Sequence, residues 1–139
     1  MSHEKVTIEA VVNADIKKVW EYWNHPEHIV NWDFASDDWH CPRASNDLRP
    51  GGKLDVRMEA KDGSFGFDFE AIYDEILEYE KITYTMGDGR QSTSIFVDLG
   101  NHQTKISTSF DAEHENPVEM QKAGWQAILD NFKKYAEEN

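Results

Sequence analysis

Residues 117–136 read PVEMQKAGWQAILDNFKKYA and form one long amphipathic stretch. Its apolar side chains recur at the spacing of an α-helix and share one stripe: Val118, Trp125, Ile128, Leu129, Phe132, Tyr135 and Ala136. Charged and polar side chains occupy the opposite face. Proline is well suited to the first turn of a helix, so the pattern predicts a C-terminal helix that begins at Pro117. Such a helix needs an apolar surface to cover.

The residues before this helix predict that surface. Residues 54–60 and 65–73 alternate apolar and polar side chains on either side of the turn signal Lys-Asp-Gly-Ser. Pairing Met58 with Phe67 also places Arg57 opposite Asp68. One face of this hairpin is then apolar and the other is charge-paired, which supports the register.

A second run of strands follows at residues 82–86, 93–99 and 102–108. We expect a two-residue turn at Gly100-Asn101, because glycine suits the first position of such a turn. This turn pairs Ile95 with Ile106. It predicts that the inner face is formed by Thr93, Ile95, Val97 and Leu99.

The N-terminal part predicts a strand over residues 6–12 and a helix capped by Asn13 or Asp15. His25-Pro26 interrupts this helix, and Pro26 opens a second short one. Residues 39–45 form a further candidate strand. The order is strand, two short helices, about six antiparallel strands and a long helix. It predicts a single α+β domain over residues 1–139.

The composition narrows the possible partners. The chain has 139 residues, 39% of them hydrophobic, and a net charge of −13. This charge argues against nucleic acid and anionic membranes as partners. The sequence shows no signal peptide or membrane span, so we expect a cytoplasmic protein. The high charge also opposes loose association, and we expect a monomer or a weak homodimer formed through a sheet edge.

Several stretches together resemble the START-like or SRPBCC superfamily, in particular the branch of activators of heat-shock-protein ATPase and their homologues. They are residues 14–20, 26–32, 50–53, 75–84 and 124–129. The resemblance implies a helix-grip fold, in which a curved antiparallel sheet wraps around the C-terminal helix. It also implies that a cavity commonly lies between the two. Members bind lipids, polyketides, hormones or flavonoids, some catalyse cyclisation, and others are co-chaperones.

The predicted register directs a set of aromatic and polar side chains toward the space between sheet and helix. The candidate ligand-binding residues are Trp32, Trp39, Met58, Phe67, Phe69, Tyr84, Thr108, Gln121 and Trp125. Trp32 and Trp39 are expected near its mouth. Gln121 is the main polar candidate, because it lies within the apolar helix stripe and a buried amide needs a partner. The alternative is that the rings fill the core. Gln121 would then bond to the sheet backbone or to Thr108, or be partly exposed near the start of the helix.

The other groups of polar side chains do not predict a metal site or a catalytic site. His25 and His28 lack the further converging donors that a metal site needs. His40 and Cys41 are adjacent on a strand and point to opposite faces, so they form no nucleophile–base pair. No carboxylate pair is placed where a raised pKa is forced. We therefore predict no catalytic residue, no metal and no cofactor.

Three functions are compatible with this sequence. The favoured one is non-enzymatic binding of a small, largely apolar molecule, lipid- or polyketide-like, in the cavity. The second is a co-chaperone-like interaction domain whose partner is a chaperone, with a role in the stress response. The third is a cyclase or hydrolase that uses the same cavity.

Overall fold

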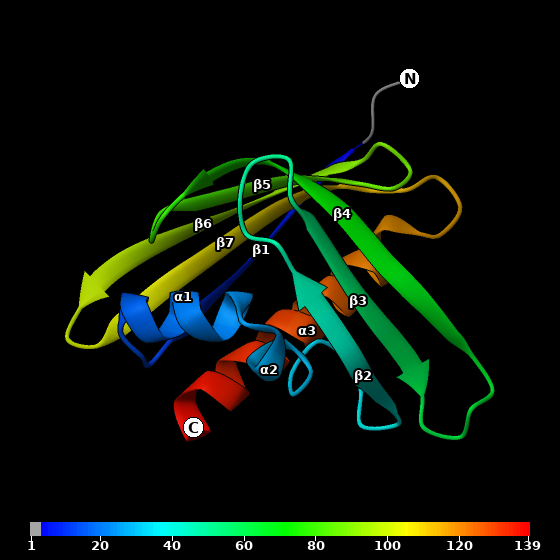
Figure 1. Ribbon diagram of the computed structural model, residues 1–139, viewed down its shortest axis with the longest axis horizontal. Coiled ribbons are helices and arrows are strands. Elements are labelled where there is room, and N and C mark those ends of the chain that lie inside the picture. The colour runs from blue at the N-terminus through cyan, green and yellow to red at the C-terminus, as the bar shows by residue number, and fades with distance from the viewer. Residues whose placement is uncertain (1–3) are drawn as a thin grey trace.

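The computed structural model describes residues 4–139 (Figure 1). Seven strands form one antiparallel sheet in the order β1-β7-β6-β5-β4-β3-β2. The strands are β1 (Lys5–Val12), β2 (Trp39–Asn46), β3 (Lys53–Ala60), β4 (Gly66–Leu77), β5 (Lys81–Met86), β6 (Gln91–Gly100) and β7 (Gln103–Asp111). The helices are α1 (Ile16–Asn24), α2 (Pro26–Ile29) and α3 (Val118–Glu138).

The curved sheet arches over α3, while α1 and α2 lie beside the C-terminal half of that helix (Figure 1). The predicted α+β helix-grip architecture is therefore confirmed. The interior where the layers meet holds fully buried residues from both, including Phe110 and Ile106 of β7 and Phe132 of α3. No helix of the described residues is both long and apolar enough to cross a membrane.

The two N-terminal helices begin where the sequence predicts, although α2 ends at Ile29, before Val30 and Trp32. The Asp15 carboxylate accepts hydrogen bonds from the backbone N–H groups of Lys17 and Lys18, at 3.0 and 3.1 Å, and so caps α1. The helix ends at Asn24, and Pro26 occupies the first turn of α2. A capping carboxylate satisfies N–H groups that have no partner within the helix, which fixes the start of α1.

The register of the β3–β4 hairpin is confirmed. Met58 pairs with Phe67 and Arg57 pairs with Asp68. Met58 is buried, whereas the Arg57 guanidinium lies 3.6 Å from the Asp68 carboxylate on the outer face. The two faces of this hairpin thus differ as the alternating pattern predicts.

The register of the β6–β7 hairpin was predicted wrongly. Asn101 and His102 both have positive φ and form the turn, and Ile95 pairs with Ser107 instead of Ile106. A register shift between Asp98 and Gly100 accompanies this turn. Both central residues of a type I′ turn need positive φ, and asparagine tolerates it well. The shift reverses the faces of β6. Ile95, Val97 and Leu99 are exposed, and the inner face is formed by Ser92, Ser94 and Phe96.

The turn before β3 binds directly to β4. Gly51 donates a backbone hydrogen bond to Tyr73 at 2.8 Å, and Tyr73 donates one to Gly52 at 3.0 Å. A Cβ atom on Gly52 would lie only 2.0 Å from the backbone oxygen of Asp47. This position therefore requires glycine for space, because the atom in the way is main chain.

We predict that Gly52→Ala destabilises the protein by about 1–3 kcal/mol, through the forced shift of the 47–52 turn. Gly87→Ala is the matched control. Gly87 also lies in a turn, but a Cβ there meets no atom within 4 Å. Urea unfolding measures both variants. An equal loss of stability in the two would contradict the steric explanation.

Candidate functional site

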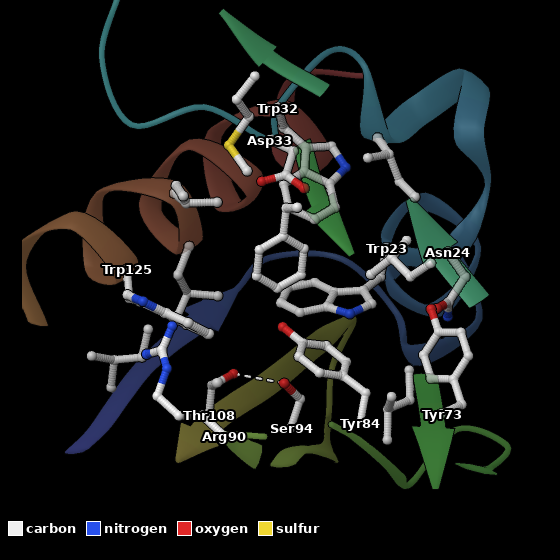
Figure 2. Close-up of a pocket in the computed structure, with 18 of the residues that line it drawn as sticks. Trp23, Asn24, Trp32, Asp33, Tyr73, Tyr84, Arg90, Ser94, Thr108 and Trp125 are labelled. Carbon is white, nitrogen blue, oxygen red and sulfur yellow. Dashed lines mark hydrogen bonds between the residues drawn. The ribbon is translucent and has the colours of Figure 1, made fainter. Parts of the chain in front are cut away.

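A cavity of about 280 Å³ lies between the sheet and α3 (Figure 2). Its walls come from every layer of the fold and are mostly apolar or aromatic. They are formed by Ile8, Trp23, Asn24, Ile29, Trp32, Asp33, Leu54, Met58, Phe67, Phe69, Tyr73, Ile82, Tyr84, Arg90, Ser94, Thr108, Trp125, Ile128 and Leu129. The volume is just below the range of about 300–1,000 Å³ typical of small-molecule sites.

Seven of the nine candidate residues line this cavity. They are Trp32, Met58, Phe67, Phe69, Tyr84, Thr108 and Trp125. The β3–β4 register was predicted correctly, and it brings Met58, Phe67 and Phe69 to the same face of the sheet. Trp125 stacks on Phe110, with ring centroids 4.0 Å apart, and this contact fixes the indole at the α3 side of the cavity.

Gln121 is not among the residues that line the cavity, and the structure gives its amide another role. The Gln121 carbonyl accepts a hydrogen bond from the Glu113 N–H at 2.8 Å. Its amide nitrogen donates to the backbone oxygens of Glu113 and Asn116 at 3.2 and 2.8 Å. The side chain therefore ties the 113–116 loop to the first turns of α3. Helical spacing placed it on the apolar stripe but did not reveal this loop.

Trp39 also lies outside the lining. Its ring contacts Phe65 and Phe67 at the tip of the β3–β4 hairpin, with centroids 6.0 Å apart in both cases. Phe67 does line the cavity and is 42% exposed, so it lies at the mouth. Trp39 thus supports a mouth residue and does not itself form the wall.

A cluster of rings from α1, the 30–34 segment and α3 makes one wall rigid. Trp23 and Trp32 are stacked with centroids 5.2 Å apart, and Phe132 meets both edge-on at 5.0 and 4.9 Å. The Trp32 indole N–H donates to the backbone oxygen of Tyr22 at 3.0 Å. A buried indole needs such a partner, and this bond fixes the segment that follows α2.

Asp33, which the sequence analysis did not select, points its carboxyl into the cavity from this segment (Figure 2). Its backbone N–H donates to the oxygen of Ile29 at 3.0 Å. Asn131 of α3 donates to the backbone oxygens of Trp32 and Phe34, at 2.8 and 3.5 Å. The residues on both sides of Asp33 are thus held on α3, which sets the direction of its side chain.

Desolvation by burial raises the pKa of Asp33 to about 7. Asp33 is a single carboxyl and belongs to no carboxylate pair, so a search for such pairs does not find it. The available signal was an acid between two aromatic residues, Trp32 and Phe34, in a segment without clean periodicity. A carboxyl that titrates near neutrality can give or accept a proton at physiological pH, as general acid–base chemistry requires.

The neighbours of Asp33 keep their own protons. Burial, assisted by the charge of Asp33, raises the pKa of Cys41 to about 12, and its thiol donates to the oxygen of Arg43. Burial is also the main reason why the pKa of Tyr84 is raised, with the charge of Asp33 as a smaller cause. Cys41 is thus an unreactive thiol, and Tyr84 presents a neutral hydroxyl to the cavity.

The opposite wall carries hydroxyl groups and a guanidinium. Ser94 and Thr108 hydrogen-bond to each other at 2.8 Å (Figure 2). The reversed face of β6 explains why Ser94 lies here. Arg90 donates to the Asp88 carboxylate at 2.7 Å and to the backbone oxygen of Asp111 at 3.0 Å. Within residues 4–139, no three potential metal ligands come together.

Comparison with known proteins shows that the sequence matches one protein family. The family described as activator of Hsp90 ATPase homolog 1-like protein matches residues 13–137, which is most of the chain. The chain belongs to this family. None of the curated proteins compared with it matches.

Solved structures of family members and other proteins share the fold. An AHSA1-like protein from Aeromonas hydrophila is 40% identical, with a TM-score of 0.91 over 97% of this chain and 93% of that one. A protein from Cytophaga hutchinsonii is 50% identical, with a TM-score of 0.82 over the same shares. A protein from Chromobacterium violaceum is 20% identical, with a TM-score of 0.86 over 98% and 99% of the two chains, and shows the fold alone.

All residues that line the cavity lie within the range matched by the family, except Ile8 of β1, which precedes residue 13. In this AHSA1-like domain the cavity combines aromatic walls, a half-buried acid and a cation held at the opposite wall. Such an arrangement can enclose an apolar molecule and orient it through a few polar contacts.

Proposed function

We propose that this AHSA1-like domain binds a small, largely apolar molecule in the cavity between α3 and the curved sheet. The observation that carries the proposal is the cavity of about 280 Å³, whose lining is mostly apolar and aromatic. Packed interiors have few voids larger than a water molecule, so a space of this size is a feature that a ligand explains.

The polar contacts differ from those that the sequence suggested. Tyr84 and Thr108 keep the roles proposed for them, since both line the cavity. Asp33 and Arg90 take the place of Gln121, whose amide is occupied by the 113–116 loop. The ligand is therefore oriented from two opposite walls, with the aromatic rings in contact with its apolar body.

Titration with the neutral dye N-phenyl-1-naphthylamine tests this function. We expect saturable binding with enhanced, blue-shifted emission. Ile128→Trp should abolish most of this signal, because Ile128 lines the cavity and a larger side chain fills it. Met120→Trp is the matched control on the same helix, because Met120 is 61% exposed and lies outside the cavity.

Circular dichroism establishes that each variant is folded. A folded wild-type protein that takes up no dye would overturn the proposal. So would equal binding by the Ile128 and Met120 variants, because the dye would then bind elsewhere. Native mass spectrometry of the purified protein supplies the mass of any carried-over molecule.

The description of the matched family favours a second function, that of a co-chaperone-like domain that interacts with a chaperone. Its test is stimulation of the chaperone's ATPase by the purified domain. An enzyme that uses the same cavity is the third candidate, and Asp33 would be its general acid or base. We favour binding because it requires only the cavity itself.

A further inference from the structure

Asp33 is the most unusual group of the cavity, because it is the one acid among the described residues that line it and its half-buried carboxyl has no partner there. Burial is the only cause of its raised pKa, and no described residue contributes a hydrogen bond or an opposite charge to it. Its carboxyl points into the cavity (Figure 2). Buried carboxylates are normally paired, and an unpaired one is costly.

The surroundings of this carboxyl suit a positive charge. Trp23, Trp32, Phe67, Phe69 and Tyr84 line the same cavity. The faces of aromatic rings attract organic cations, and a carboxylate beside such rings adds a charge-assisted hydrogen bond. The net charge of −13 also favours the approach of cations over anions.

We propose that the ligand of this cavity is an apolar amine, whose ammonium group binds the Asp33 carboxylate and whose hydrocarbon body contacts the aromatic walls. The inference rests on the proposed function and names the chemical class of its ligand. Asp33 is the specificity-determining residue. Asn131 is a positioning residue, because it holds the backbone on both sides of Asp33.

Arg90 is the one cationic group of the lining, and it does not compete for this role. Its guanidinium forms an ion pair with Asp88 at 2.7 Å, so its charge is already balanced. It also lies at the wall opposite Asp33 (Figure 2). A ligand acid would have to disrupt or share that ion pair, whereas a ligand amine meets an unpartnered carboxylate.

Displacement of bound N-phenyl-1-naphthylamine by three matched competitors tests the inference. They are 1-naphthylmethylamine, which is positively charged, 1-naphthalenemethanol, which is neutral, and 1-naphthoic acid, which is negatively charged. All three have similar apolar bodies. At about pH 8 we expect the amine to displace the dye at a concentration lower by about tenfold or more than the alcohol, as a charge-assisted contact implies. In Asp33→Asn this ratio should fall close to one. The matched control is Asp37→Asn, an exposed residue four positions further along the chain, which should keep the preference.

The pH dependence gives an independent measurement on the wild-type protein. The other titratable groups of the lining are Tyr73, Tyr84 and Arg90, and Cys41 lies within electrostatic range of Asp33. Burial raises the pKa of both tyrosines and of Cys41, so these groups stay neutral near pH 7. α3 contributes only Trp125, Ile128 and Leu129, which do not titrate. Amine affinity should therefore weaken about tenfold from pH 8 to pH 6, as Asp33 gains its proton, while alcohol affinity stays constant.

Several results would overturn the inference. They are equal displacement by amine and alcohol, stronger displacement by the acid, or an amine affinity that does not change with pH. In each of these cases the dye still binds and the proposed function stands. Failure of the wild-type protein to bind dye at all would instead overturn the proposed function.

Discussion

Asp33→Asn is expected to make the protein more stable at about pH 8, by roughly 2–3 kcal/mol. In the wild-type protein the folded state must hold this acid in a desolvated site with a pKa near 7. In the unfolded chain the same acid is solvated and has a pKa of about 3.9. Asparagine carries no charge, so the variant avoids most of this cost. The gain stays below the full linkage of about 4 kcal/mol, because an amide also loses solvation on burial.

The sign of the pH dependence follows from the raised pKa. Between about pH 4 and pH 7 the folded state keeps a proton on Asp33 that the unfolded state has released. The contribution of Asp33 to the free energy of unfolding is therefore most favourable below about pH 4, and it is lost as the pH rises to about 7. The advantage of the variant should grow across this range and then level off.

Urea unfolding of both proteins at several pH values measures this difference. Asp37→Asn serves again as the control. The difference in unfolding free energy between this variant and the wild-type protein should stay constant across the same pH range. A constant advantage of Asp33→Asn at all pH values would contradict a raised pKa at this position. A residue that lowers stability while facing a cavity is typical of a binding site, where function and stability conflict.

Phe132→Ala is expected to destabilise the protein by about 3–5 kcal/mol, the usual cost of deleting a fully buried aromatic ring. Phe132 is 0% exposed and supports both Trp23 and Trp32 from α3. Its removal leaves a void behind the wall that carries Asp33. Dye affinity should fall as well, because Trp32 and the segment after it lose their support.

Thermal and urea unfolding test this prediction. Lys134→Ala, on the exposed face of the same helix, should change stability by less than about 0.5 kcal/mol. Phe132→Leu should fall between the two, since it keeps part of the buried volume. A loss below 1 kcal/mol for Phe132→Ala would show that the neighbouring rings close the void without cost.

The fold was predictable because it depends on local sequence patterns that recur along the chain. The apolar stripe of residues 118–136, the Asp15 cap and the Met58–Phe67 pairing all follow from spacing and from short turns. Met58, Phe67 and Phe69 line the cavity for the same reason. The β6 face was predicted wrongly, because a single shifted turn residue exchanges the two faces of a strand.

Periodicity, together with capping and turn residues, determined the elements, their order and the aromatic character of the interior. Only the tertiary structure decided that the Gln121 amide binds a loop and that Asp33 is a half-buried acid without a partner in the cavity. The Gln121 contact depends on how the 113–116 loop folds back onto the start of α3, and the position of Asp33 depends on Asn131, which is about a hundred residues away in sequence. The environment of a polar group is set by what surrounds it in space, and no spacing rule along the chain contains that information.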